Sequence, residues 1–411
     1  MDTPILNNRQ LRPILLGIVL ILTANICYYT EDSIPIYITL SGVGMLLILF
    51  RYLRVTNYKI FIEPFIVWVT VLYTMYFIYG FLFSNGGLFN WDMLLFTYVS
   101  NIVLYLALRI IITREDWISI LIKPIGMTVI IISILIFTND ITGVVVAENE
   151  TRFGGSLSGN VNSVAVYLGV LSMFVCYHYA KTKNKVTLGL LFLCFAFMLL
   201  TGSKKAIIII LCDLFIYLKI SKQKALAFLV FVCAIVGGTI MVMQVPLLYN
   251  IIGHRVQDLF FQVFGIGTGS YSSASDMSSS IRKDLIFEAL EIYLKDPLFY
   301  LTGGGWNAFS ANSHYHNLAY YSHCNYTEML CTFGLLGTSM YYFPLFTIYK
   351  KVGRLNASRD EYYFSMIITL MMFLLSFFMV IFSDVCIVYL PYIILFLLVE
   401  RGKLYRQSSN D

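Results

Sequence analysis

The chain has 411 residues, of which 59% are hydrophobic, 16% aromatic and only 12% charged, and its mean hydropathy is +0.78. These values lie far outside the average for soluble globular proteins and exclude that class. The net charge of +5 comes from basic residues scattered over many short segments, so it excludes a continuous nucleic-acid-binding stripe. The composition predicts an integral membrane protein.

Twelve apolar runs approach the length of about 20 residues that a helix needs to cross a bilayer. They cover residues 14–29, 34–50, 60–83, 93–112, 117–137, 161–179, 186–200, 206–220, 225–243, 326–349, 362–382 and 385–399. We therefore predict an all-α integral membrane protein with about 12 transmembrane helices, forming one polytopic domain over residues 1–411.

The basic residues predict the orientation, because cytoplasmic loops retain Lys and Arg. With the N-terminus inside, most of the 28 Lys and Arg residues fall on the cytoplasmic side, so both termini are expected there. A cleavable signal peptide is not expected, since the first apolar run lacks a small-residue cleavage pattern and more spans follow it. Most of the eight cysteines lie inside predicted spans and are expected to pack as small apolar residues.

Two long connections are predicted on the outer side: residues 244–325, between spans 9 and 10, and the smaller segment 138–160. Loops of such length are usually functional or disordered. The Gly/Ser-rich stretch 265–280 has no nucleotide-binding fingerprint, because its glycines lack the preceding strand and following helix. The sequence IRKDLIFEALEIYLKDP, residues 281–297, predicts an amphipathic helix that ends before Pro297.

The spacing within this helix predicts two faces. One is a polar stripe formed by Asp284, Glu288, Glu291 and Lys295. Arg282 has the spacing of the apolar residues and is predicted to point with them. A buried Arg needs a partner anion, so we expect Arg282 to face a cavity that holds an anionic ligand. A snorkelling Arg at the helix start is the alternative.

Glycines and histidines follow this helix. The glycines at 303, 304 and 305 permit close backbone approach to a ligand, or simply a sharp turn. His314, His316 and His323 come next, but no carboxylate stands at ligand spacing, so we expect separate polar histidines and no metal site. Glu328 lies about one turn inside the tenth predicted span, where a charged group is unusual.

Several cations are predicted on the same outer side: Arg152, Lys204, Lys205, Arg255 and Arg282. Each taken singly is equally well explained as a solvated loop charge. Together, and with a histidine, they suit a pyrophosphate or an anionic lipid headgroup. Asn160 and Asn162 stand at a predicted helix start, where Asn is a good cap.

Four segments carry a family resemblance. RFGGSLSGNVNSVA, TGSKKA, RKDLIFEALEIYLKDPLFYLTGGG and SHCNYTEMLCTFGLLG, in this order, resemble motifs of the O-antigen polymerase and O-antigen ligase superfamily, the Wzy-type membrane glycosyltransferases. The last segment is similar to the pattern HNxYLELLxxFGLLG of that family. The resemblance covers about residues 151–337, and the first five spans match only as generic membrane helices.

The resemblance implies a lipid-linked sugar reaction at the outer face of a bacterial inner membrane. The donor is a glycan on undecaprenyl pyrophosphate, and the acceptor is the hydroxyl of another lipid-linked repeat unit in polymerases or of lipid A core in ligases. Neither a nucleotide sugar nor a metal cofactor is implied. The expected partners are the lipid-linked repeat units, membrane lipid and a chain-length regulator protein.

The chemistry of glycosyl transfer assigns roles to the residues. His323 is the candidate base for the acceptor proton, and an interfacial hydrogen-bonded His is the alternative. Arg282 and Arg152 are candidates for stabilising the pyrophosphate leaving group. Lesser or supporting roles are expected for Arg255, Lys204, Lys205, Asn160, Asn325 and Glu328, with Asn325 capping the tenth span and Glu328 pairing with a cation or capping the first turn.

The sequence departs from the family pattern at two places. Cys324 follows His323 where many members have Asn, and Lys204–Lys205 stand where Arg is commoner; Lys lacks the bidentate phosphate contact of Arg. A polymerase is preferred on the form of the His-led segment, and a ligase is the first alternative. A transporter or flippase of lipid-linked oligosaccharide is the second. Transporters usually show internal repeats and ionisable groups near the membrane midplane, whereas here the main ionisable residues inside predicted spans are Glu63, Lys123 and Asp213, and the functional-looking residues cluster on one face.

Overall fold

The computed structural model describes residues 8–25, 34–56, 63–85, 90–138, 161–221, 273–314, 321–355, 358–382 and 386–408, and the single positions 244, 249 and 253. Within these ranges every regular element is a helix. One isolated bridge pairs Ser84 with Trp306. The predicted all-helical class is therefore confirmed for the described residues.

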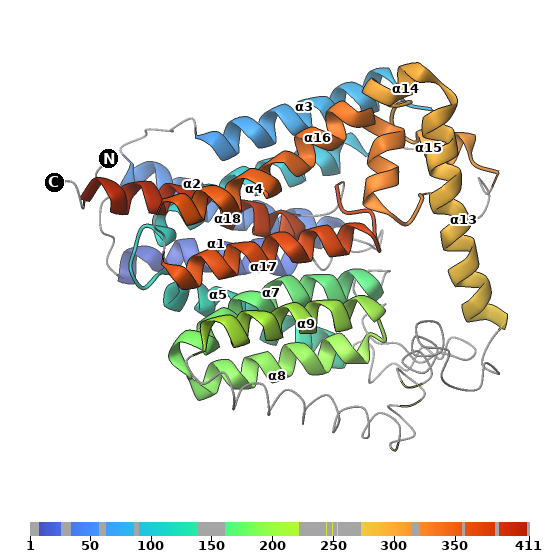
Figure 1. Cartoon of the computed structure of the whole chain (residues 1–411). Coiled ribbons are helices and arrows are strands. Elements are labelled where there is room, and N and C mark those ends of the chain that lie inside the picture. The colour runs from blue at the N-terminus through green and yellow to red at the C-terminus, as the bar shows by residue number, and fades with distance from the viewer. Residues whose placement is uncertain are drawn as a thin grey trace.

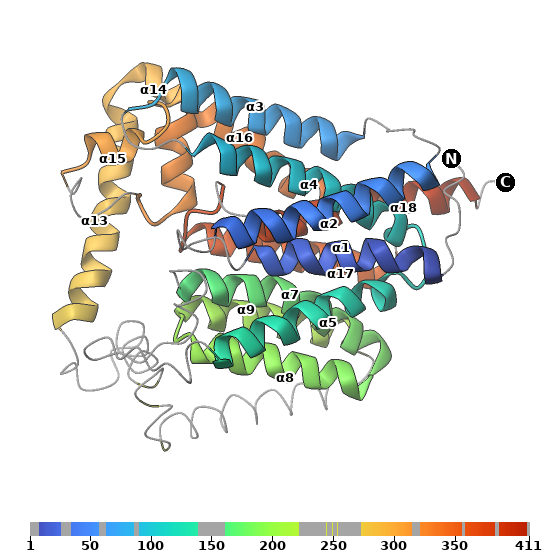
Figure 2. The ribbon, with the colours of Figure 1, turned by 180° about the vertical axis from the view of Figure 1, so that it is seen from behind.

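The long helices lie side by side along one common direction (Figures 1 and 2). They are α1 (Asn8–Ala24), α2 (Ile34–Val55), α3 (Pro64–Leu82), α4 (Trp91–Ile112), α5 (Trp117–Ile136), α7 (Val161–Thr182), α8 (Lys185–Leu200), α9 (Lys204–Ile220), α16 (Asn325–Arg354), α17 (Arg359–Ser376) and α18 (Cys386–Ser408). Three further described helices, α13 (Ser273–Lys295), α14 (Pro297–Thr302) and α15 (Ala308–Asn312), lie at the end opposite the two termini, where α13 runs across the bundle (Figure 1).

Among the residues that the structure describes, six helices are long and apolar enough to cross a membrane: α2 from Pro35, α3, α4, α5, α7 and α16. The helices α1, α8 and α9 have 17, 16 and 17 residues, slightly fewer than a span usually needs. The predicted run 225–243 lies outside the described residues. The total of 12 spans thus remains a prediction, while a multi-pass membrane protein is supported.

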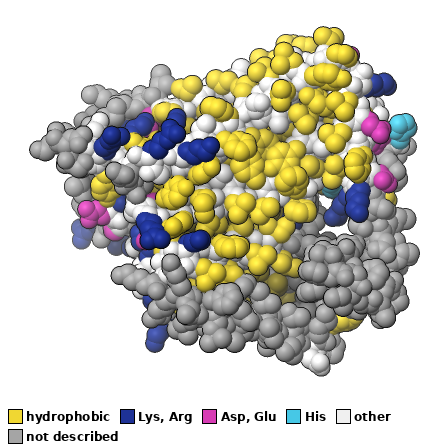
Figure 3. All heavy atoms as spheres, viewed as in Figure 1, with side chains coloured by type: hydrophobic (Ala, Val, Ile, Leu, Met, Phe, Trp, Pro, Cys, Tyr) yellow, Lys and Arg dark blue, Asp and Glu magenta, His cyan; other side chains and the backbone are white. Residues whose placement is uncertain are grey.

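Charged side chains gather at the two ends of the bundle, and hydrophobic side chains cover the surface between them (Figure 3). The helices that end near the termini carry a basic residue in their last turn: Arg54, Arg109, Lys181, Lys219 and Arg354. A cation at a helix C-terminus is favourable for the helix dipole. The same residues follow the charge pattern of a cytoplasmic membrane boundary.

Buried ion pairs join helices at the end of the bundle where the two termini lie. Nε of Arg401 lies 3.1 Å from Oε1 of Glu361, and its Nη1 donates to the carbonyl oxygen of Ile112 at 2.6 Å. Glu63 precedes α3 and pairs with Arg109 of α4. Glu63 was predicted to lie inside a span, but Pro64 starts the helix, so Glu63 occupies the position before it. The Arg401–Glu361 pair therefore joins α18 to α17, and the Glu63–Arg109 pair joins the start of α3 to α4.

Helix α16 is broken at Gly334, where φ is 62° and ψ is −163°. Side chains disfavour a positive φ, which glycine adopts freely. The break frees the carbonyl groups of Cys331 and Thr332, which accept hydrogen bonds from the backbone N–H groups of Gly304 (2.7 Å) and Gly305 (3.1 Å). The glycine-rich turn therefore approaches the backbone of α16, and this contact positions the outer half of the helix, residues 325–333.

Candidate functional site

The predicted base, His323, lies in a short turn that leads into α16. Its backbone has φ 61°, a left-handed conformation that is uncommon for residues other than glycine. The imidazole is half-buried, and its ring centroid lies 4.4 Å from that of Tyr321. A residue held in such a conformation needs surrounding contacts that fix it.

Side chains from the first turns of α16 supply those contacts. Glu328, which is buried, accepts a hydrogen bond through Oε2 from the backbone N–H of Ser322 at 2.7 Å. The hydroxyl of Ser322 lies 2.9 Å from that of Thr327 and donates to the carbonyl of Cys324 at 3.0 Å. The two residues that flank His323 are thus tied to the helix that follows. Glu328 was expected to pair with a cation or to cap its own helix; instead it holds this turn.

Three predicted residues from separate parts of the chain act on one another electrostatically. The pKa of His323 is lowered to about 4, first by burial and then by the positive charges of Arg282 on α13 and Lys205 in the first turn of α9. Because α9 and α16 both begin at the end where α13 crosses the bundle, these groups share that end (Figures 1 and 2). An uncharged imidazole beside two cations is suited to accept a proton next to a bound anion.

The faces of α13 differ from the predicted faces. Its buried side is formed by Leu285, Glu288, Ala289 and Ile292, whereas Arg282 is exposed. Arg282 has the spacing of the buried side, three residues before Leu285 and seven before Ala289, although its own side chain is exposed. The prediction placed Glu288 on the polar stripe, and that assignment was wrong. The reason is that polar groups of a neighbouring segment satisfy the buried carboxylate, so burial does not follow hydrophobicity alone.

Glu288 is the centre of a hydrogen-bonded cluster. It accepts from the hydroxyl of Ser313 at 2.7 Å, and from the backbone N–H of His314 at 2.5 Å. The ring Nδ1 of His314 lies 2.8 Å from the same carboxylate. Burial raises the pKa of Glu288, but the hydrogen bonds from Ser313 and His314 outweigh it and lower the pKa. The ionised carboxylate therefore joins α13 to the segment after α15.

Asn325 joins α16 to the end of α17. Its Oδ1 accepts hydrogen bonds from the backbone N–H groups of Ile381 (2.7 Å) and Phe382 (3.0 Å), and its Nδ2 donates to the hydroxyl of Tyr342 at 2.7 Å. The predicted cap of α16 was wrong, since Cys324 is the N-cap and makes no side-chain bond there. Asn325 anchors the helix that carries the His323 turn to its neighbour.

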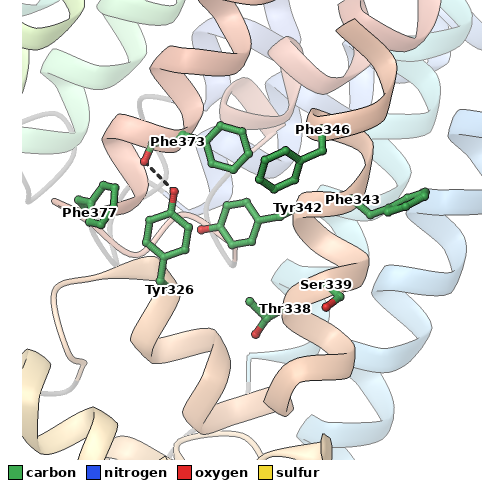
Figure 4. Close-up of a pocket in the computed structure, with 8 residues that line it drawn as sticks. All are labelled: Tyr326, Thr338, Ser339, Tyr342, Phe343, Phe346, Phe373 and Phe377. Atoms are coloured by element: carbon green, nitrogen blue, oxygen red, sulfur yellow. Dashed lines mark hydrogen bonds between the residues drawn. The ribbon is translucent and has the colours of Figure 1, made fainter. Parts of the chain in front are cut away.

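An aromatic groove lies between α16 and α17, and its lining residues come from both sides of the break in α16 (Figure 4). It has a volume of about 520 Å³ and is lined by Tyr326, Thr338, Ser339, Tyr342, Phe343, Phe346, Phe373 and Phe377. The hydroxyl of Tyr326 donates to the carbonyl of Phe373 at 3.0 Å (Figure 4). Sequence reasoning missed this groove because its lining residues come from both sides of the break at Gly334 and from α17, and an apolar run does not reveal how these segments pack.

Several predicted site residues have no described environment. Arg152, Asn160 and Arg255 lie outside the described residues, as does His316. Lys204 begins α9, but its side chain is not among those described. In the part of the chain that the structure describes, no three His, Cys, Asp or Glu side chains gather as ligands for a metal ion.

Comparison with known protein families identifies a related segment of the chain. Residues 189–342 match a family model described as O-antigen ligase. The match begins inside α8, includes α9, α13 and the His323 turn, and ends inside α16, and it confirms the resemblance to the O-antigen polymerase and ligase superfamily. It supports a glycosyltransferase-like function of polymerase or ligase type in the membrane. No curated protein matches the chain.

Proposed function

Within the O-antigen polymerase and ligase superfamily, we propose that this protein is a polysaccharide polymerase of a bacterial inner membrane. It transfers a glycan from undecaprenyl pyrophosphate to the hydroxyl of another lipid-linked repeat unit at the outer face. The observation that carries this proposal is the electrostatic effect of Arg282 and Lys205 on the His323 imidazole at the end of the bundle that α13 crosses. The basic residues at the end that bears the termini support a cytoplasmic location for both termini.

In this proposal His323 is the general base. The acceptor oxygen attacks the anomeric carbon of the donor sugar, its proton passes to the imidazole, and the bond from that carbon to the pyrophosphate oxygen breaks with its electron pair leaving on pyrophosphate. An uncharged imidazole is required at the start, and burial together with the two cations favours that form. The bound pyrophosphate offsets those cations and makes His323 a stronger base once the donor is in place.

The cations bind the pyrophosphate and stabilise the charge that develops as it leaves. Arg282 is exposed on α13 and suited to a bidentate phosphate contact, and Lys205 adds a point charge at the start of α9. Arg152, Arg255 and Lys204 are proposed as further pyrophosphate ligands, and Asn160 as a supporting residue. Cations near a good leaving group remove the need for a metal ion and for a strong general acid.

The direct test uses purified protein in detergent with a synthetic lipid-pyrophosphate repeat unit and a chelator of divalent metals. Growth of the glycan chain, measured by gel or mass spectrometry, is the expected result. Matched reactions with Arg282→Ala and with its exposed neighbour Lys283→Ala separate a site effect from a general surface effect. A protein that moves the lipid across a vesicle bilayer but builds no chain is a transporter, and the proposal is then wrong.

An O-antigen ligase is the second candidate, since the family that matches residues 189–342 is described as O-antigen ligase. A ligase would transfer the glycan to lipid A core. Deletion of the gene separates the two functions on a gel of surface polysaccharide. Loss of a polymerase leaves a single repeat on core, whereas loss of a ligase leaves uncapped core and accumulated lipid-linked polymer. The chain-length regulator is a proposed partner only of the polymerase.

A further inference from the structure

A set of large apolar side chains is exposed where α14 meets the outer end of α3. Leu298 and Leu301 of α14 are 76% and 60% exposed, and Phe81 and Leu82 of α3 are 60% and 72% exposed. Helix α14, with the sequence PLFYLT, carries no charged side chain. Exposed apolar surface of this kind marks contact with a membrane or another protein.

Hydrogen bonds hold α14 in place against α13. Asp296 precedes α14 and accepts through Oδ1 from the backbone N–H of Leu298 at 2.9 Å. The hydroxyl of Tyr293 donates to the carbonyl of Tyr300 at 2.9 Å, and the hydroxyl of Tyr300 donates to the carbonyl of Leu294 at 3.0 Å. These hydrogen bonds fix the bend between α13 and α14, residues 293–300, which we call the elbow. The exposure of Leu298 therefore follows from a defined position of α14.

The same elbow is tied to α3. The hydroxyl of Tyr79 donates to the carbonyl of Thr302 at 2.6 Å, and the amide of Asn85 donates to the carbonyl of Gly304 at 2.7 Å. Both views of the fold place α14 beside the outer end of α3 (Figures 1 and 2). The position of α14 along the bundle axis is thus fixed by contacts with α3, which is a candidate membrane span.

The exposed large hydrophobic residues of α3 form one stripe: Val67, Val71, Ile78, Phe81 and Leu82. Val71 lies four residues after Val67, Ile78 seven after Val71, and Phe81 and Leu82 three and four after Ile78. This spacing places them on one helical face, which an isolated membrane span turns toward lipid. The exposed side chains of α14 continue this face beyond the end of α3. Figure 3 shows hydrophobic surface reaching from the middle of the molecule along its upper edge to this end.

We propose that α14 is inserted into the outer leaflet of the bilayer and anchors α13 at the membrane surface. The occupant of the exposed face is the hydrocarbon of membrane lipid, because the face is uncharged and continuous with the lipid-facing stripe of α3. An anchor at this elbow fixes the level at which α13, and Arg282 with it, crosses the outer end of the bundle. The inference does not depend on the proposed polymerase activity.

Cysteine accessibility tests the anchor directly. Leu298→Cys and Leu301→Cys are compared with Lys295→Cys, an exposed residue on the same elbow. Each purified variant is reconstituted in vesicles of phosphatidylethanolamine and phosphatidylglycerol and treated with a charged, membrane-impermeant maleimide. The unsubstituted chain gives the background, and labelling in dodecyl sulfate gives the total thiol. Orientation in the vesicles affects all three variants equally.

The thiols at 298 and 301 are expected to react at least about tenfold more slowly than the thiol at 295, since thiol reactivity follows exposure to water. Equal rates at the three positions in vesicles would overturn the proposal. Protection at 298 and 301 in native membranes but not in pure lipid vesicles would also overturn it, because a partner protein would then cover the face. Two independent positions keep the test valid if one variant is poorly folded.

Discussion

Glu328 accepts a hydrogen bond from the backbone N–H of Ser322 at 2.7 Å, six residues earlier in the chain. The bond spans the turn that contains His323 and the N-cap of α16. Because Thr327 also contacts the Ser322 hydroxyl, the left-handed conformation of His323 is imposed by the helix that follows it. The carboxylate therefore positions the candidate base.

Replacing Glu328 tests this role. Glu328→Ala leaves a buried N–H group unpaired, at a cost of about 1–3 kcal/mol, and releases the His323 turn. A displacement of about 1 Å at a catalytic group is sufficient for a loss of about 100-fold in turnover. Glu328→Gln keeps an acceptor oxygen and is expected to retain much more activity. The measurements are kcat, KM and thermal stability of both variants.

These measurements distinguish a role of Glu328 in positioning His323 from a role in the stability of the protein. A positioning role predicts that kcat falls much more than the melting temperature accounts for, and that Gln rescues it. If kcat of Glu328→Ala is normal, the hydrogen bond from Ser322 to Glu328 has no role in the reaction. If Gln and Ala lose stability and activity in parallel, Glu328 is only structural.

Part of the candidate site could be predicted from the sequence, and the part that depends on the turn before α16 could not. His323, Arg282 and Lys205 were predicted from residue type and from the segments that resemble the family, and the structure brings their charges together. Ser322 and Thr327 were missed because a chain reversal before a helix has no periodic signal. Their residue types were the available clue, since Ser and Thr beside a helix start commonly bond to nearby backbone.

The pH dependence of transfer tests His323 as the base. Its pKa of about 4 means that the imidazole is uncharged at neutral pH and becomes protonated only in acid. The value of kcat/KM, which reports the free enzyme, should therefore stay level from neutral pH downward and fall near pH 4. The donor pyrophosphate offsets the nearby cations, so the fall in kcat should lie at higher pH.

A charge variant sharpens the same experiment. Lys205→Met removes one positive charge that lowers the pKa of His323, so its pKa rises and the acid limb of kcat/KM moves to higher pH. Lys283→Met is the matched control, because Lys283 lies on α13 and does not contribute to that shift. Circular dichroism at each pH excludes unfolding as the cause. Identical acid limbs in Lys205→Met and wild type would contradict the assignment.

Arg282 is expected to matter for transfer and not for stability. Its side chain is exposed, and exposed substitutions usually change stability by less than about 0.5 kcal/mol. Removing a cation that stabilises a leaving group costs about 100-fold or more in rate, so Arg282→Ala should abolish visible chain growth. Arg282→Lys keeps the charge without the bidentate contact and should be intermediate.

Membrane insertion and melting temperature serve as controls for these variants, and Lys283→Ala is the neighbouring surface substitution. Chain growth at a near-normal rate in Arg282→Ala would remove Arg282 from the site. Loss of growth in both variants would indicate a general effect on α13.

The fold was predictable where it follows local periodicity. Helix α13 ends at Lys295, directly before Asp296 and the predicted stop at Pro297. The faces of that helix were not predictable, since Glu288 is buried through bonds to Ser313 and His314. The short runs 186–200 and 206–220 do form helices, α8 and α9. The sequence predicts that α8 and α9 are helices, but whether each crosses the membrane depends on its length and on how it packs against its neighbours.

The contact between Gly303 and Gly334 gives a stability prediction. Gly303 has φ 75°, and a Cβ added there would lie 2.5 Å from backbone atoms of residues 332–334; one added at Gly334 would lie 2.5 Å from the backbone of Gly303 and Leu301. Backbone atoms cannot move aside as a flexible side chain does. Gly303→Ala and Gly334→Ala should therefore each cost more than the roughly 1–3 kcal/mol of a strained backbone conformation.

Gly189→Ala is the matched control, because a Cβ there meets nothing within 4 Å and the residue lies inside α8. That substitution should leave stability unchanged or raise it by up to about 1 kcal/mol. Yield of monodisperse protein and melting temperature in detergent are the measurements. The break in α16 sets the outer half of the helix and with it the His323 turn, so activity should fall with stability in the first two variants. Normal melting temperatures in both would mean that the Gly303–Gly334 contact does not form in the membrane.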